Sequence, residues 1–403
     1  MKTILILGAG KEQTYAIKLA NQKKIRTIVL DKNPKAEGAV YADEFYPIST
    51  RDVNQITEFL KGYNKKIDGV MTIASDIPHC VSTAAGIINV PHIPLQAAYT
   101  CIQKLNMKKV LRDGKVNVPD FSQIKSSKEL AAFIADASYP VVIKPVDNSG
   151  ARGVLRITKD TDLQWAFDYT KQFSYSGDIL VEKFIDGTQI SIEGLTVEDV
   201  FYCTGFADRN YERIEKTAPY LVEDGGDIPS ILNSHKKEMV VKEFEKAART
   251  LGINWGPAKG DMIFGNDGKV YVIEIAARLS GGNFCYDKVP WSTGVNIVDI
   301  LIDMSVGNPV DIKKLEPTKN LSASQRYFFP TSGKIKEIRH ITDVENMNYV
   351  KKLDLWVKHG DVVPETVNHP SRVGYVISCA PTLTEAVACA EKAVQTIEFV
   401  MES

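Results

Sequence analysis

The chain has 403 residues, of which 44% are apolar, and carries 49 lysines and arginines against 50 aspartates and glutamates. This length allows two or three domains, and the balanced charge gives no bulk attraction to nucleic acid or to a membrane surface. The six cysteines have no C-x-x-C spacing, which excludes a zinc site or a disulfide framework and is typical of a cytoplasmic protein, and no apolar run is long enough for a signal peptide or a membrane span.

The first 95 residues alternate short apolar strands with helical stretches, a pattern typical of a parallel α/β domain. Strands are expected at Ile4–Leu7, Thr27–Leu30 and Gly69–Ile73. The turn Gly8-Ala9-Gly10, followed 21 residues later by Asp31, resembles half of a dinucleotide site. Gln13 stands where the third glycine of that fingerprint belongs, so a plain turn between strand and helix is the favoured interpretation, with Asp31 as a capping or turn residue.

The next segment, from about residue 100 to 118, predicts a basic helix that carries Lys104 and is closed by Gly114. After it we expect a helix over 126–137, a strand over 139–145, a glycine-bearing loop, a helix over 161–173 and a strand over 178–187. Lys144 ends the first of these strands, and backbone N–H groups of the loop can surround phosphate oxygens that its ammonium neutralises. Lys144 also suits a strand end before a surface turn, and Lys104 suits a solvated charge.

Two carboxylates are predicted on one hairpin, which follows a helix over 233–252. If residues 265–268 form its loop, Asp261 and Glu274 are diagonal neighbours about 7 Å apart, close enough to share a hard cation. Alternation continues the same face through Ala276 to Arg278. A solvated acidic face is the alternative, and a one-residue bulge would separate the pair.

Residues from about 311 onward predict a further unit of several strands, one of them within 372–380. A closing helix is expected over 382–400, where Thr382 and Glu385 have capping-box spacing.

Taken in order, Lys104, Lys144 with its glycine loop, "VEKFIDG", Asp261 and "IEIAARLSGG" resemble the ATP-grasp superfamily over nearly the whole chain. The resemblance implies a mixed α/β and α+β fold in three domains. These are an N-terminal Rossmann-like pre-grasp domain (1–95), a two-lobed ATP-grasp domain (96–310) and a C-terminal α+β domain (311–403) like that of the L-amino-acid-ligase-like and biotin-carboxylase-like branches. The small lobe is expected at about 120–185 and the large lobe at about 186–310.

The resemblance also implies that ATP, rather than a nicotinamide, lies between the two lobes. The residues implied to contact ATP are Lys104, Lys144, Ser149, Gly150 and Gly153 at the phosphates, Glu182 with the backbone of Lys183, Phe184 and Ile185 at the adenine, and Gln189 at the ribose. Asp261 and Glu274 are implied to hold Mg²⁺ or Mn²⁺, and Arg278 to stabilise the reacting centre. Many members carry an acid at the position of Gln189 and an asparagine at that of Ala276, so ATP or metal affinity is expected to differ here.

The implied reaction is ligation of a carboxylate to an amine through an acyl phosphate, with release of ADP and phosphate. A bicarbonate-dependent carboxylase, a non-catalytic ATP-binding regulatory module and a dehydrogenase are the alternatives. The expected partners are small acids and amines, and a homodimer would be in keeping with the family. Arg209 and Arg326 are candidates for pairing with substrate, against the simpler interpretation of exposed loop arginines, and the segments that contain Asp76, His79 and Tyr99 are expected to face the cleft.

Overall fold

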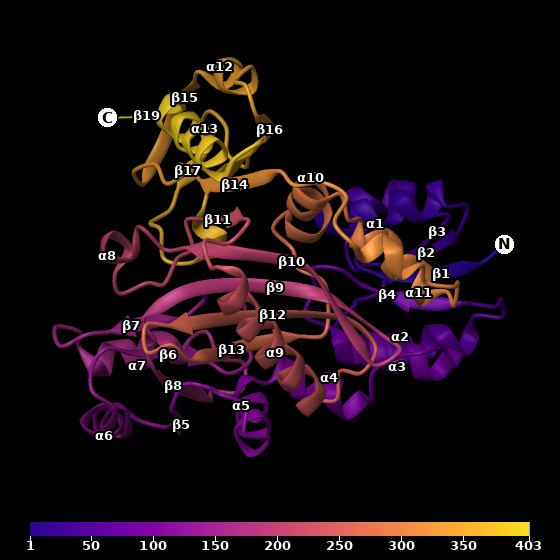
Figure 1. The fold of residues 1–403 in the computed structure, drawn as a ribbon, viewed down its shortest axis with the longest axis horizontal. Coiled ribbons are helices and arrows are strands. Elements are labelled where there is room, and N and C mark those ends of the chain that lie inside the picture. The colour runs from indigo at the N-terminus through magenta and orange to yellow at the C-terminus, as the bar shows by residue number, and fades with distance from the viewer. Residues whose placement is uncertain (403) are drawn as a thin grey trace.

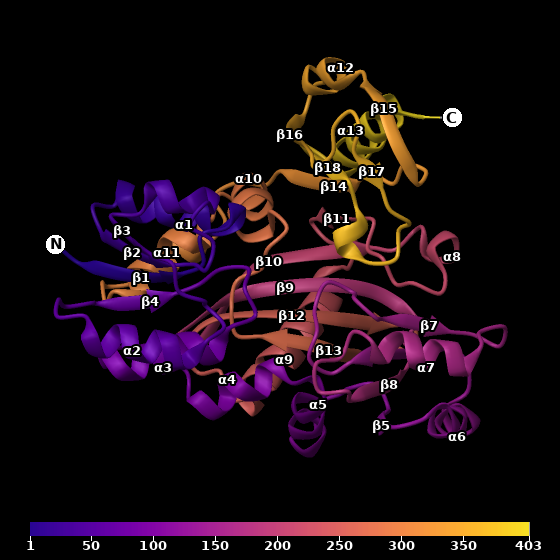
Figure 2. The ribbon, with the colours of Figure 1, turned by 180° about the vertical axis from the view of Figure 1, so that it is seen from behind.

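The computed structural model describes residues 1–402 as four sheets with helices packed against them (Figures 1 and 2). The N-terminal sheet is parallel, in the order β3-β2-β1-β4, with strands β1 (Thr3–Leu7), β2 (Arg26–Leu30), β3 (Glu44–Tyr46) and β4 (Gly69–Met71). Its two faces are covered by the helices α1 (Lys11–Gln22) and α11 (Ile297–Ser305) on one side and α2 (Val53–Gly62) and α3 (Pro78–Ile88) on the other. β1 is therefore buried along its whole length, which explains its unbroken apolar sequence.

The predicted basic helix is two helices, α4 (Leu95–Ile102) and α5 (Lys104–Asp113), with Gly114 at the end of the second. Gln103 separates them because its backbone is extended, and its side chain accepts a hydrogen bond from the N–H of Asn106 at the start of α5 (2.7 Å). After this break, Leu105 of α5 packs against Leu180 of the next sheet.

That sheet is antiparallel, in the order β5-β8-β6-β7, and is the smaller of the two sheets that line the central cavity. Its elements are β5 (Phe121–Ile124), α6 (Ser127–Ala137), β6 (Val141–Pro145), β7 (Leu155–Ile157), α7 (Leu163–Lys171) and β8 (Ile179–Lys183). Ser126 and Asp162 cap α6 and α7 through their side chains, an interaction typical of serine and aspartate at helix starts. Both helices pack on one face of the sheet, so the other face is free to line the cleft.

The large sheet has eight antiparallel strands in the order β13-β12-β9-β10-β11-β14-β18-β16. They are β9 (Gly187–Val197), β10 (Val200–Asn210), β11 (Gly225–Ile228), β12 (Gly256–Gly265), β13 (Val270–Ala276), β14 (Ser322–Tyr327), β16 (Val350–Leu355) and β18 (Gly374–Ala380). The helix α9 (Ser234–Thr250) packs on β12 and β13 through Val240, Phe244 and Ala247. α8 (Ile214–Thr217), a π-helical turn (Phe284–Lys288) and α10 (Val289–Thr293) connect the remaining strands.

The last unit adds a three-stranded sheet, β17-β15-β19, from β15 (Gly333–Arg339), β17 (Val362–Val363) and β19 (Glu398–Met401). The helices α12 (Ile341–Glu345) and α13 (Leu383–Thr396) accompany it. The capping box of Thr382 and Glu385 is confirmed, but the helix ends at Thr396 rather than near residue 400. The β-branched and aromatic run after it forms β19, because pairing with β15 overrides continuation of the helix.

Two features cross the predicted domain limits. Helix α11 lies in the stretch predicted for the grasp domain but packs on the N-terminal sheet, and β14, β16 and β18 of the last unit extend the large sheet. No helix of the described residues is both long and apolar enough to cross a membrane.

Candidate active site

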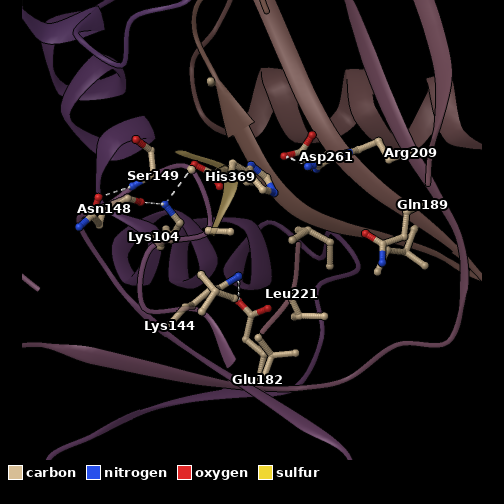
Figure 3. Close-up of a pocket in the computed structure, with 18 of the residues that line it drawn as sticks. Lys104, Lys144, Asn148, Ser149, Glu182, Gln189, Arg209, Leu221, Asp261 and His369 are labelled. Carbon is tan, nitrogen blue, oxygen red and sulfur yellow. Dashed lines mark hydrogen bonds and ion pairs between the residues drawn. The ribbon is translucent and has the colours of Figure 1, made fainter. Parts of the chain in front are cut away.

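A cavity of about 310 Å³ lies between the β5-β8-β6-β7 sheet and the large sheet (Figure 3). This volume is at the lower end of the range for small-molecule sites. Of the predicted site residues, those that line it are Lys104, Lys144, Ser149, Gly150, Glu182, Lys183, Phe184, Ile185, Gln189, Asp261, Glu274 and Arg278. Gly153 does not: it has a φ of +70°, and a Cβ there would lie 2.8 Å from Phe173, so it shapes the loop from behind.

A buried ion-pair network holds Lys144 in place. Lys144 Nζ is 2.8 Å from Glu182 Oε1, and Lys108 Nζ is 3.2 Å from the same oxygen and donates to the carbonyl of Val272 (3.0 Å). Burial would raise the pKa of Glu182, but the two lysines outweigh it and hold that pKa below its ordinary value. Burial lowers the pKa of Lys108 to about 8. The carboxylate of Glu182 thus positions Lys144, and its contact with adenine stays a prediction.

Lys104 is buried and not a solvated charge. Its ammonium donates to the carbonyl of Asn148 (2.8 Å) and lies 3.2 Å from Glu274 Oε1. It therefore ties the loop after β6 to the carboxylate on β13, and Figure 3 shows the dashed line from Lys104 to Asn148 of that loop.

Asp261 and Glu274 face each other directly across β12 and β13, which corrects the predicted diagonal pairing. The hairpin loop is one residue longer than expected, so Phe264 pairs with Val270, and a bulge between Asp261 and Met262 then restores alignment. Directly opposed Cβ atoms lie about 5 Å apart, closer than diagonal ones. The bulge that was expected to separate the pair brings it together.

Asp261 forms ion pairs with two cations, one on its own strand β12 and one on β10. Lys259 Nζ is 2.6 Å from Asp261 Oδ1, and Arg209 of β10 is 2.8 Å from Oδ2. Burial opposes ionisation of this carboxyl, yet Arg209 and Lys259 keep its pKa well below the ordinary value. Arg209 also pairs with Glu223 (2.6 Å), so it is a half-buried strand residue rather than an exposed loop arginine.

β13 ends at Ala276, so the strand does not persist to Arg278 as the predicted alternation assumed, but Arg278 still lines the cavity, and its Nε donates to Asp76 Oδ1 at 2.7 Å. Of the three residues expected to face the cleft, Asp76 lines the cavity, whereas His79 and Tyr99 pack on each other outside it, with ring centroids 5.2 Å apart. Arg326 lies outside this cavity as well and forms a two-point ion pair with Asp227 (2.7 and 3.1 Å), so it is a buried strand residue rather than an exposed loop arginine, and its pairing with substrate stays a prediction.

A second cavity of about 200 Å³ adjoins the first and shares Arg209, Lys259, Arg278 and His369 with it. The C-terminal unit supplies His369 through the loop before β18. The backbone N–H of His369 donates to the carbonyl of Gly150 (3.1 Å), and its Nε2 accepts from the N–H of Glu223 (3.3 Å). Burial, followed by the neighbouring Arg372, lowers the pKa of His369 to about 3, so the imidazole is neutral.

Sequence reasoning overlooked Lys108, Lys259 and His369. The first two carried a signal: Lys108 follows Lys104 by one helical turn, and Lys259 precedes Asp261 by two strand positions. His369 had none, because it belongs to no motif and reaches the site only through the tertiary fold.

Side chains of the protein itself occupy the space at the turn Gly8-Ala9-Gly10, where a dinucleotide would have to bind. Gln13 donates to the carbonyl of Ile73 (2.6 Å), and Asp31 accepts from the N–H of Ala9 (2.9 Å), which makes Asp31 a turn residue. Glu12 accepts from the N–H of Gly282 (2.8 Å) on the segment that follows Arg278. Through Glu12, this turn is therefore hydrogen-bonded to the segment that follows Arg278. The dinucleotide interpretation has no geometric support.

The carboxylate pair fits a divalent cation that is shared with a polyphosphate. Within residues 1–402 no three His, Cys, Asp or Glu side chains converge on one point, so a cage built of protein ligands alone is absent from that range. Mg²⁺ is commonly held by one or two carboxylates with substrate phosphates completing its shell. Asp261 and Glu274 meet that description.

Comparison with known proteins agrees with this geometry. Residues 101–282 match the model of the ATP-grasp domain, and residues 326–402 match that of L-amino acid ligase C-terminal domain 2. The chain is 24% identical over 325 residues to 3-methyl-D-ornithine–L-lysine ligase of Methanosarcina barkeri (79% of this chain and 78% of that protein). It is 24% identical over 405 residues to an uncharacterised protein of Sinorhizobium fredii (98% and 82%).

In structure the chain resembles an L-amino acid ligase from Bacillus licheniformis, with a TM-score of 0.83 at 21% identity over 100% of this chain and 99% of that one. The chain contains an ATP-grasp domain over residues 101–282, and its named relatives include ligases. Its C-terminal part is the domain found in L-amino acid ligases. The predicted family and the mixed α/β fold class are confirmed.

Proposed function

We propose that the protein is an ATP-dependent carboxylate–amine ligase that forms an amide or peptide bond and releases ADP and phosphate. The observation that carries the proposal is the position of the opposed Asp261 and Glu274. They stand beside Arg209 and Lys259, which line both cavities, so a phosphoryl group leaving ATP there meets a substrate in the second cavity. Small acids and amines are the substrates in this proposal, and a homodimer and a cytoplasmic location remain predictions.

In this proposal ATP occupies the first cavity, with Lys104, Lys144 and the loop containing Ser149 and Gly150 at its phosphates and Gln189 at its ribose. The adenine lies against the Lys183–Ile185 segment. The N–H groups of Lys183 and Phe184 already donate to the carbonyls of Asp120 (2.8 Å) and Pro140 (3.2 Å). Across the described residues, the N–H of Ile185 is the one of the three without a backbone acceptor, so it is the donor available to a purine.

Asp261 and Glu274 would hold Mg²⁺ or Mn²⁺, and such an ion, when bound, supplies neutralisation of the phosphate charge. Gln189 can still hydrogen-bond ribose hydroxyls through its amide.

The reaction needs no protein nucleophile. A carboxylate oxygen of the first substrate attacks the γ-phosphorus, the bond to the ADP oxygen breaks, and an acyl phosphate forms. The amine nitrogen then attacks the acyl carbon, phosphate leaves with the electron pair of the C–O bond, and the proton lost by the nitrogen passes to the departing phosphate. In this proposal Arg278, held by Asp76, stabilises the negative charge that develops on the acyl oxygen. The hydrogen bond from His369 to Gly150 holds the loop over this point and limits hydrolysis of the acyl phosphate.

The test is ADP release measured with amino acids supplied singly and in pairs, with bicarbonate as a separate arm. ADP release that requires both a carboxylate and an amine is the expected result. Phosphate release with bicarbonate and no organic acid would identify a carboxylase instead, and ATP binding without turnover for every pair would contradict the proposal.

A further inference from the structure

The second cavity is lined by cationic and amide side chains. Arg209, Lys259, Arg278, Lys288 and Arg372 line the cavity, against the acidic Asp208 and Glu223. His369 adds no charge, because it is neutral. Three of the five cations have carboxylate partners: Arg209 with Glu223 and Asp261, Lys259 with Asp261, and Arg278 with Asp76.

Lys288 is the exception that points to a ligand. It ends the π-helical turn, is 6% exposed, and makes no side-chain hydrogen bond or ion pair with any residue the structure describes. The two carboxylates whose charges act on Lys288 are already paired with other cations, Glu223 with Arg209 (2.6 Å) and Asp227 with Arg326 (2.7 Å). Burial lowers the pKa of Lys288 to about 8, so the ammonium stays mostly charged at neutral pH at a cost in stability.

Gln325 supplies a second unsatisfied donor in the same cavity. It is 1% exposed, and its Nε2 has no hydrogen-bond partner among residues 1–402. Buried amide donors are rarely left without an acceptor unless a water or a ligand completes them.

Arg372 completes the set. Its guanidinium stacks on the ring of Tyr327 (3.6 Å to the centroid) and donates to the backbone carbonyls of His369 (2.9 Å) and Glu223 (3.3 Å). It pairs with no carboxylate of the described chain. The cavity thus contains a buried lysine, a half-buried arginine and a buried amide that lack an anionic or acceptor side-chain partner among the described residues.

We propose that Lys288 and Gln325, with Arg372 beside them, bind a carboxylate or phosphate group of the amine substrate and so select an anionic amine. This inference rests on the proposed function. The activated carboxylate has to lie at the junction with ATP, near Arg278, so the amine approaches from the opposite side. A negative group on that amine then reaches the unpaired donors.

The first experiment measures binding and does not need turnover. Thermal shifts are recorded for the wild type, Lys288→Met and Lys242→Met with sodium phosphate or sodium acetate against sodium chloride at equal ionic strength. A non-hydrolysable ATP analogue fills the first cavity. Lys242 is an exposed helix lysine paired with Glu238 and serves as the matched control.

We expect an anion-dependent rise in Tm for the wild type and the control and at least about tenfold weaker anion affinity for Lys288→Met, as for loss of a buried charge pair. Without anion, Lys288→Met should melt at a temperature equal to or above that of the wild type, because an unpaired buried charge has been removed. Equal anion responses in wild type and Lys288→Met, or no response in either, would overturn the inference.

The second experiment uses turnover and identifies the anion. Each active amine is compared with its amide-blocked form and with a phosphate-bearing amine. Lys288→Met should raise KM for the anionic amine at least about tenfold with little change in KM for ATP, and Lys288→Arg should restore part of it. ADP release that is indifferent to the anionic group would sink this inference and leave the ligase proposal intact. If Lys288→Met loses anion binding but no substrate pair gives ADP release, the anion site is supported and the ligase proposal is contradicted.

Discussion

Replacing Glu182 by Gln should destabilise the protein and weaken ATP binding together, because the wild-type network balances one buried carboxylate against Lys108 and Lys144. All three side chains are nearly inaccessible, with exposed fractions of 3%, 1% and 6%. Breaking a buried ion pair by removing one partner costs about 3–5 kcal/mol. The loss of folding free energy has an upper limit, because the unpaired Lys108 can become neutral instead of staying charged. Neutralising a lysine with the ordinary pKa of 10.5 at pH 7 costs about 5 kcal/mol.

The measurement is the free energy of unfolding in urea together with the Kd for ATP. The variant Glu215→Gln is the control, since Glu215 pairs with Arg156 at the surface and is 76% exposed, and it should change the free energy by less than about 1 kcal/mol. A double variant with Lys108→Met and Glu182→Gln returns the buried charge to that of the wild type and should recover most of the stability. If Glu182→Gln has the free energy of unfolding and the Kd for ATP of the wild type, Glu182 neither stabilises the fold nor positions Lys144 for ATP.

Three further results are expected. Glu274→Gln should lower kcat at least about 100-fold while binding of metal-free ATP persists, because one of two carboxylates for the cation is lost; near-normal turnover, followed by ADP release, would refute the metal assignment. Ile185→Pro should raise the KM for ATP about tenfold by deleting the free N–H, whereas Ile185→Val keeps the N–H and should not; equal KM values would place the adenine elsewhere. His369 has a folded pKa of about 3 against 6.5 ordinarily, so the unfolded chain binds the extra proton and stability falls as pH drops from 6.5 toward 3; His369→Gln should flatten this loss in acid unfolding, and an unchanged slope would contradict a neutral imidazole in the folded protein.

Sequence patterns predicted the elements that local physics determines. The capping box of α13 and the apolar runs of β1 and β2 were predictable, because each depends on residues a few positions apart. Glu274 and Arg278 both line the cavity as expected, although β13 ends at Ala276 and strand alternation does not extend to Arg278. The register of their hairpin was predicted wrongly, since a loop one residue longer and a compensating bulge leave no mark in composition.

The rest of the site depends on contacts between distant segments. In sequence Arg209 resembles a loop residue, and only the pairing of β10 with β9, and of β9 with β12, places it beside Asp261. Gln325 and His369 reach the second cavity from the C-terminal unit, far beyond Arg278 along the chain. No periodicity links them to the motifs of the grasp, because periodicity reports only neighbours on one helix or strand.

The shared large sheet limits how this protein can be cut or recombined. β14 pairs with β11 on one side and with β18 on the other, so exchanging everything after residue 311 for the equivalent part of another ligase would remove the partner of β11. A strand edge exposed in that way invites pairing with a second chain and aggregation. Hybrid enzymes with new acceptor preferences would therefore have to keep the sheet whole and vary only the loops that it carries.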